Sequence, residues 1–295
     1  TNSIGSAGLI VQSIAGGGGY VSQTGGSEEY DIRFGAKGNL IGDAGNVSLK
    51  SNGEFVITEK AFSPALVAQS VAGGGGFALI SANDSGSTRI GASSNDLGST
   101  NSGNVTVNNS AILYTKGDFS TALTAQSIGG GGAYTGQVDG SAQFGSSSSS
   151  GSQNAGKVSL INSGSVQTSG NFSPLINVQS IGGGGGRAGD IGTTLNLGAV
   201  NLIGASANGG DVTVRNSAKL LISKGLSSPA LLAQSIGGGG GASAEVTGNV
   251  TMGASGTGTA NAGAVNVTSS SQIQTTGNNS IGLLAQSIGG GGGVA

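Results

Sequence analysis

The sequence predicts an all-β fold: a repetitive β-solenoid, or parallel β-helix, with five units of 52–57 residues and, from the length of a short coil, about two or three coils per unit. Two observations carry this prediction. A tripeptide, Gln-Ser-Ile or Gln-Ser-Val, recurs with a glycine run behind it, and short aliphatic segments recur at fixed offsets from it. Glycine makes up 62 of the 295 residues and aromatic residues only 4%, so one unit cannot build a core alone and must stack on its neighbours.

The repeat is defined by its glutamine. The tripeptide begins at positions 57, 57, 53, 55 and 52 residues apart: Gln12, Gln69, Gln126, Gln179, Gln234 and Gln286. These spacings predict one array over residues 1–295, with units at about 12–68, 69–125, 126–178, 179–233 and 234–285 and partial units at 1–11 and 286–295. Because both ends fall inside a unit, we expect the chain to be a fragment or a processed part of something longer.

Each glutamine lies in an apolar segment that predicts a strand. An aliphatic residue lies three positions before it and a small apolar residue one before, and a β-branched residue follows two positions later at Ile14, Val71, Ile128, Ile181, Ile236 and Ile288. We interpret this as a half-buried strand, LxAQSI, in which every second side chain is apolar, with Ala and Ile inward and Gln and Ser on the alternate positions. A serine six residues before each glutamine, followed by proline in three units, predicts a turn at the strand entrance.

Glycine runs follow the strand, beginning at Gly16, Gly73, Gly129, Gly182, Gly237 and Gly289. Ordered glycine costs backbone entropy, so a recurring run indicates a recurring use. We favour an extended segment that a neighbouring strand or a second chain approaches closely, and the alternatives are a sharp corner with positive φ and a flexible linker.

The rest of each unit predicts two more short strands and a variable loop. A Gly-x-Val-x-Leu/Val segment leads to an Asn-containing turn, at Asn52, Asn109, Asn162 and Asn216, with Ser269 in the fifth unit. A third strand such as Val56-Ile57-Thr58 follows. Between the glycine run and Gly-x-Val the length varies, which is how a solenoid displays loops on one face.

Composition argues against several classes of function. The net charge of −2 provides no excess of positive charge to attract nucleic acid. The sequence also has no apolar stretch of 18 residues that would insert into a membrane. With no cysteine and no histidine, thiolate and zinc sites and histidine base catalysis are ruled out. We expect no cofactor and no metal, with isolated surface calcium on Asp or Asn as the alternative.

The sequence also predicts that the chain is not an enzyme. The one tight acidic cluster of the sequence consists of Glu28, Glu29 and Asp31. A glycan-cleaving solenoid would need such a cluster to supply a pair of catalytic acids, but charged side chains on a solvated loop explain it better. Matching threonines such as Thr106 and Thr213 raise ice binding as a further alternative, which the strand preference of threonine makes unnecessary.

At the level of whole blocks, the repeats resemble a known family. The pattern of Gly-x-Val-x-Val, an Asn turn and AQSIGGGGG, as at 233–241 and 285–293, is similar to passenger-domain repeats of large bacterial surface proteins of the autotransporter or haemagglutinin-like adhesin type. The resemblance spans the chain. It implies secretion, a right-handed parallel β-solenoid stalk, and a role in adhesion, biofilm or surface fibres.

These observations predict a structural or adhesive extracellular repeat region on a bacterial cell surface, acting as a rigid stalk and contact surface. The alternative is a self-assembling extracellular filament subunit, because open solenoid ends are unpaired strand edges. The expected partners are accordingly a second copy of the chain, end to end or lateral, or a glycan or protein of a host or cell surface.

Overall fold

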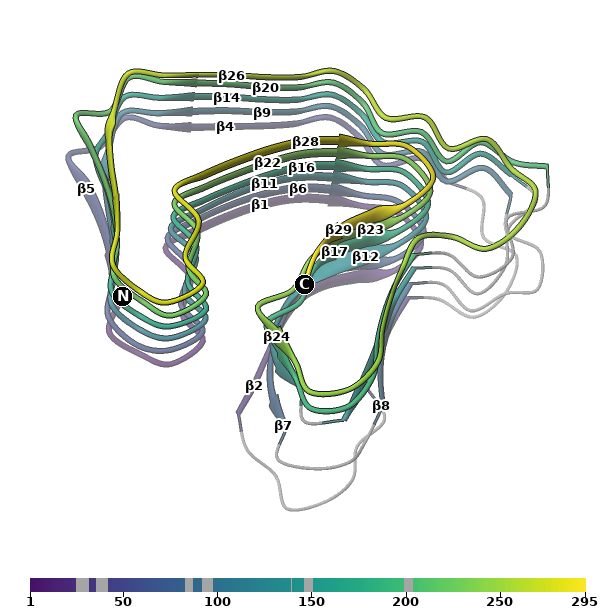
Figure 1. Ribbon diagram of the computed structural model, residues 1–295, viewed down its shortest axis with the longest axis horizontal. Coiled ribbons are helices and arrows are strands. Elements are labelled where there is room, and N and C mark those ends of the chain that lie inside the picture. Colours follow the sequence, from purple (N-terminus) through teal and green to yellow (C-terminus); the bar gives the residue numbers. More distant parts are fainter. Residues whose placement is uncertain are drawn as a thin grey trace.

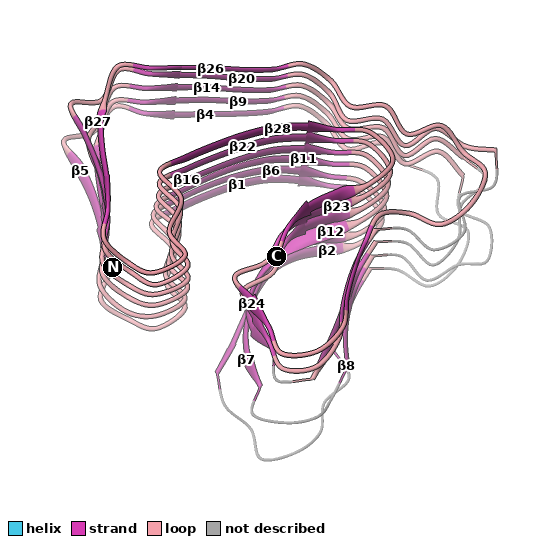
Figure 2. Ribbon diagram, in the orientation of Figure 1, coloured by secondary structure: helices cyan, strands magenta, loops and turns pink. Residues whose placement is uncertain are grey.

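A computed structural model describes residues 1–24, 32–35, 42–82, 87–91, 98–138, 140–145, 151–198 and 204–295. Within these ranges the chain contains strands, turns and loops and no helix (Figure 2). All named strand pairs are parallel, and they form five stacked sheets. The predicted all-β class with stacked parallel strands is therefore confirmed, and the arrangement is compatible with a β-solenoid.

The central sheet is built from the glutamine segments, one strand from each successive unit. Its six strands, in order, are β1 (Leu9–Ile14), β6 (Leu66–Val71), β11 (Leu123–Ile128), β16 (Ile176–Ile181), β22 (Leu231–Ile236) and β28 (Leu283–Ile288). Figure 1 views the molecule down its shortest axis and shows these strands one behind the other. We call the strands contributed by one unit a layer.

Register shows that each unit contributes one layer. Gln12 pairs with Gln69, and Gln126 with both Gln69 and Gln179, so hydrogen-bonded neighbours stand one whole repeat apart. The prediction of two or three coils per unit is wrong, because no second strand of a unit lies between these partners. Six layers at about 4.8 Å span about 24 Å between the first and the last.

A first core lies between the central sheet and two others (Figure 1). The Gly-x-Val segments form the sheet of β4 (Val47–Ser51), β9 (Val105–Asn109), β14 (Val158–Asn162), β20 (Val212–Asn216) and β26 (Val265–Ser269). The short third strands form the sheet of β5 (Phe55–Thr58), β10 (Ile112–Thr115), β15 (Val166–Thr168), β21 (Leu220–Ser223) and β27 (Gln272–Thr275). Leu, Val and Ala from all three sheets are buried together, so successive units fill one continuous core.

A second, smaller core lies between the two remaining sheets. One begins with the glycine runs and contains β2 (Gly18–Thr24), β7 (Gly75–Ala82), β12 (Gly132–Val138), β17 (Gly185–Arg187), β23 (Gly240–Ala242) and β29 (Gly292–Val294), with β18 (Asp190–Ile191) and β24 (Glu245–Val246) beside them. The other contains β3 (Ile32–Phe34), β8 (Ser87–Ile90), β13 (Ser141–Phe144), β19 (Leu195–Leu197) and β25 (Val250–Met252). Each layer thus has two lobes that meet at the central strand (Figure 1).

The turns are tied to the layers above and below by side-chain hydrogen bonds. Asn109 donates to Asn162 at 2.8 Å, and Asn162 donates to Asn216 at 2.8 Å. Asn109 is buried and also caps its own turn at Ala111. The prediction that Asn52 occupies this place in the first unit is wrong: β4 pairs with β9 so that Ser51 lies opposite Asn109.

The serine before each strand plays the predicted turn role. The hydroxyl of Ser120 accepts a hydrogen bond from the backbone N–H of Ser63, and the hydroxyl of Ser173 accepts one from Ser120. The residue before each of these serines has positive φ even where it is not glycine: φ is 56° at Phe62 and 55° at Phe119 and Phe172. A left-handed phenylalanine is strained, so the packing around it must hold it there.

Candidate functional site

The six glutamines predicted to mark the repeat form one continuous ladder. Each side-chain amide donates to the side-chain carbonyl of the next glutamine, at distances from 2.6 to 2.8 Å, from Gln12 through to Gln286. The four inner glutamines are fully buried. Because the low local dielectric strengthens a satisfied polar chain and penalises an unsatisfied one, this ladder holds the layers in register.

The glutamine strand is buried on both faces, which corrects the sequence-based interpretation. In β6, β11, β16 and β22 every residue is buried, so the prediction of a half-buried strand is wrong. Ala68 and Ser70 face the first core, and the Ser70 hydroxyl accepts from Gly103 N and donates to Gly45 O. Gln69 and Val71 face the sheet that begins with the glycine runs, which we call the glycine sheet. Ala68 and Val71 therefore lie on opposite faces of the strand.

The glycine runs combine the two geometries that the sequence left open. Gly73 and Gly74 turn the chain with φ near 80°, and Gly75 and Gly76 then enter β7 with φ of 142° and 136°, which residues with side chains rarely adopt. A Cβ atom on Gly75 would lie 1.8 Å from the carbonyl oxygen of Gly132 in the next layer. The glycines at this position are ordered and closely packed, so the flexible-linker alternative is wrong here.

The row of β-branched side chains covers these glycines. Val71, Ile128, Ile181 and Ile236 form a buried cluster along the stack, with Ile14 and Ile288 packed against its ends. A Cβ atom on Gly132 would lie 2.9 Å from Cγ2 of Ile128, so the absence of side chains lets the glycine sheet pack directly on the central sheet. The glutamines, β-branched residues and glycines singled out in the sequence thus pack together along the stack and have a structural role.

Two aromatic ladders fill the gap between the lobes in the first layers. One stacks Phe62, Phe119 and Phe172, with ring centroids 5.0 Å apart in both steps. The other stacks Tyr20, Phe77 and Tyr134, with centroids 6.0 and 4.6 Å apart. The hydroxyl oxygens of Tyr134 and Thr121 lie 2.6 Å apart, which links the second ladder to the turn that carries the first.

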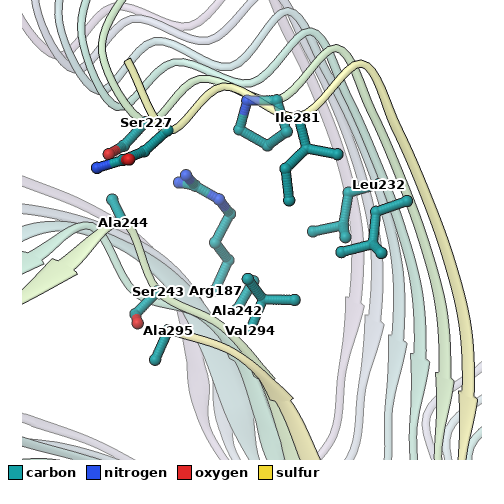
Figure 3. A pocket seen from close by; sticks show the side chains of 12 residues that line it. Arg187, Ser227, Leu232, Ala242, Ser243, Ala244, Ile281, Val294 and Ala295 are labelled. Atoms are coloured by element: carbon teal, nitrogen blue, oxygen red, sulfur yellow. The ribbon is translucent and has the colours of Figure 1, made fainter.

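In the later layers other residue types replace the aromatic residues of both ladders, and a cavity lies at these positions. The Phe172 position becomes Ser227 and then Asn279, and the Tyr134 position becomes Arg187, then Ala242, then Val294. The cavity encloses about 370 Å³. It is lined by Arg187, Ser227, Pro229, Leu232, Ala242, Ser243, Ala244, Asn279, Ile281, Leu284, Val294 and Ala295 (Figure 3).

Arg187 is the unusual member of this cavity. It is only 2% exposed, and its guanidinium carbon lies 5.6 Å from the centre of the Tyr134 ring. Its Nε and Nη1 atoms have no hydrogen-bond partner, and no carboxylate in the described part of the chain lies within ion-pair distance. Burial lowers the pKa of Arg187, but the group stays charged, so the desolvation cost is only partly offset by a cation–π contact worth about 0.5–2 kcal/mol.

Neither ladder nor Arg187 was predicted from the sequence, although the sequence contains a signal for them. Tyr20, Phe77, Tyr134 and Arg187 each lie eight residues after a repeat glutamine, and Phe62, Phe119 and Phe172 lie seven before one. An alignment of the units at these two offsets brings the aromatic columns together. It does not show that the two columns face each other, because that depends on how the lobes fold.

An exposed apolar strip lies on the outer face of the third-strand sheet. Phe55 is 58% exposed, Ile57 37% and Ile112 51%, and Phe55 pairs with Ile112 across the layers. A shallow groove of about 310 Å³ runs along this face and extends to Tyr114 and Ile222 in later layers. Contiguous exposed apolar surface of this kind marks interaction sites.

Other features singled out in the sequence have simple placements. Glu28, Glu29 and Asp31 lie outside the described residues. Within the described ranges, no three acidic side chains gather in a way that could hold a metal ion. The described chain also has no helix of the length and apolarity that crossing a bilayer requires.

No protein-family model, curated protein or solved structure matches this chain.

Proposed function

We propose that the chain is a non-catalytic segment of an extracellular bacterial surface protein, a β-solenoid that serves as a rigid stalk and contact surface. The observation that carries the proposal is the uninterrupted in-register stack, in which the six glutamines pair layer by layer. A stack with one layer per unit lengthens by about 4.8 Å for every repeat added. Repetition of the unit is thus a direct way to build a stalk.

The contact surface in this proposal is the exposed apolar strip of Phe55, Ile57 and Ile112. Ile112 lies on β10, which pairs with a strand on each side, and Phe55 and Ile57 lie on β5, the outermost strand of the sheet, which pairs with β10. This parallel pairing holds the side chains of the strip in fixed positions without help from a partner. A preformed surface loses little entropy on binding. This favours contact with a protein or glycan on another surface.

Adhesion can be measured directly with coated particles. Microspheres coated with the 295-residue chain should attach to cultured cell layers in larger numbers than albumin-coated microspheres. Ile112→Lys should lower that attachment, because it places a charge in the strip. Ile161→Lys, a control at a residue 46% exposed on a different sheet, should leave attachment unchanged. Attachment no higher than that of albumin would contradict the proposal.

Assembly into filaments is a second candidate, favoured by the central sheet. Its outermost strands, β1 and β28, carry the same LxxQSI pattern in the same register as the inner strands. A second copy adding end to end would continue both the sheet and the glutamine ladder. Light scattering over a range of protein concentrations tests this: a mass that stays at 27.9 kDa throughout would exclude filament assembly by this chain.

A further inference from the structure

The cavity between the lobes contains a charged group that no described part of the chain neutralises. The guanidinium of Arg187 is buried, and two of its three nitrogens lack a hydrogen-bond partner among the described residues. The side-chain oxygen of Ser243, which also lines the cavity, is buried and has no hydrogen-bond partner in the ranges that the structure describes. Buried polar groups are normally satisfied, so two unsatisfied groups on one cavity indicate that something else satisfies them.

The shape of the cavity follows from the side chains that replace the aromatic ladders. Ala242 and Ser227 stand where earlier layers carry Tyr or Phe, and the lost volume leaves open space over Arg187. Figure 3 shows the guanidinium end of Arg187 pointing toward Ser227, with Leu232 and Ile281 across the open space. A volume of about 370 Å³ is within the range that small ligands occupy.

The lining restricts the chemistry of a ligand. Arg187 is the one charged side chain among the described lining residues, and Ser227, Ser243 and Asn279 supply hydroxyl and amide groups. The remaining wall is aliphatic, from Pro229, Leu232, Ala242, Ile281, Leu284 and Val294. One planar cation matches one planar anion, since a guanidinium binds a carboxylate through two parallel hydrogen bonds. A doubly charged phosphate or sulfate would be left with unneutralised charge against an apolar wall.

We propose that this cavity binds a small organic monocarboxylate with a short aliphatic body, its carboxylate on Arg187 and its carbon chain against Leu232 and Ile281. The proposal is independent of the stalk and adhesion role. A stalk without a ligand would be expected to continue its aromatic ladders, as the first layers do. The exchange of Tyr for Arg in one layer, beside Ala in the next, creates charge and space together.

Butyrate is a suitable probe, and isothermal titration calorimetry at constant ionic strength measures its binding to the 295-residue chain. Butyrate should bind, and butyramide, which has the same body without the charge, should bind at least tenfold more weakly. Sulfate should also bind at least tenfold more weakly than butyrate. Equal affinity for sulfate would overturn the carboxylate assignment, and no binding of butyrate would overturn the proposal.

Arg187→Met tests the residue itself, because it keeps an unbranched side chain and removes the charge. It should weaken butyrate binding at least tenfold, while Arg215→Met, at an exposed arginine on β20, should leave binding unchanged. Thermal melting of the unliganded proteins provides a second readout: Arg187→Met should melt at a higher temperature than the wild type. Unchanged butyrate affinity in Arg187→Met would contradict the proposal.

Ala242→Phe covers the case in which Arg187→Met fails to fold. The same position carries Phe77 and Tyr134 in earlier layers, so the backbone there accepts a large side chain. Phenylalanine should fill the cavity without removing the charge, and butyrate binding should be lost in a protein whose circular dichroism matches the wild type. Retained binding would place butyrate elsewhere on the molecule.

Discussion

Gln126 lies in the middle of the glutamine ladder, where it accepts from Gln69 and donates to Gln179. Gln126→Ala leaves a buried donor and a buried acceptor without this partner, and we expect it to destabilise the protein by about 2–4 kcal/mol. Gln286→Ala removes one hydrogen bond from a half-buried residue in the last layer and should cost clearly less. Urea denaturation of both variants provides the comparison, and equal costs would contradict a cooperative ladder.

Gly75 enters β7 with φ of 142°, and any Cβ atom there would meet the carbonyl of Gly132. Gly75→Ala should therefore separate two layers, because the clash is with backbone that cannot rotate away. We expect it to prevent folding or to destabilise the protein by roughly 3 kcal/mol or more, which lowers the melting temperature by about 10 °C. Gly53→Ala, where no atom lies within 4 Å of the added Cβ, should change the melting temperature little. A tolerated Gly75→Ala would show that the layers are not packed this closely.

The residues that hold the layers together could be located from the sequence, but the direction in which their side chains point could not. The glutamines, the β-branched residues and the glycines recur at fixed offsets, which identifies them as structural. Positions one before and two after a glutamine differ by three, however, so they face opposite sides of a strand. A strand buried on both faces reads as nearly continuous apolar sequence, and the buried glutamine within it pairs with the glutamines of the neighbouring layers, which one unit alone does not reveal.

At the scale of elements, the phenylalanine stack joins three turns that are distant in sequence. Phe119 lies between Phe62 and Phe172 and is buried. Phe119→Ala should destabilise the protein by about 3–5 kcal/mol, since it removes a buried ring and leaves space between two others. Phe55→Ala makes the same chemical change at an exposed residue and should cost far less. Chemical denaturation of the two variants checks the difference, and similar costs would mean that the stack does not hold the turns.

Element types were predictable from the sequence, whereas the packing of elements across the lobes was not. The segments with alternating Val, Leu and Thr form strands as expected, and the Asn turns follow them. The first-unit turn is displaced by one residue, because pairing with the next layer, rather than residue type, selects Ser51 over Asn52. Local patterns identify a turn within one or two residues, and the neighbouring layer determines its register.

For the whole molecule, the scarcity of ionisable groups predicts a stability that depends little on pH near neutrality. The sequence contains no histidine. Hydrogen bonds from Lys116 and Lys157 lower the pKa of the Glu59 and Asp211 carboxyls. A depressed carboxyl pKa stabilises the folded state above its ordinary value, near 4.5 for Glu59 and 3.8 for Asp211, and the effect is lost as pH falls through the folded pKa.

Thermal melting from pH 8 to pH 3 tests this expectation. The melting temperature should change little between pH 8 and 5 and fall below about pH 4, where carboxylates take up protons. The double variant Glu59→Gln, Asp211→Asn should lose less on acidification than the wild type, although the effect is small because both ion pairs are exposed. A steep change between pH 7 and 6 would contradict the account.

The stacked architecture itself was predictable from repetition, but the size of a layer was not. Short strands separated by turns predict a small coil, and therefore two or three coils per unit. In the structure the strands of a unit are distributed over five different sheets around two cores, so the whole unit forms a single layer. A single unit contains no indication that its strands pair with the equivalent strands of neighbouring units and not with each other.

The distance between Lys50 and Thr268 tests the central claim that each unit adds one layer. These exposed residues occupy one column, through Asn108, Ile161 and Arg215, so four layer spacings separate them. With cysteine absent from the sequence, spin labels can be attached at these two positions alone, and double electron–electron resonance measures their separation. One layer per unit predicts a backbone separation of about 19 Å. Two or three layers per unit would give about 38–58 Å, and a distance in that range would contradict the account.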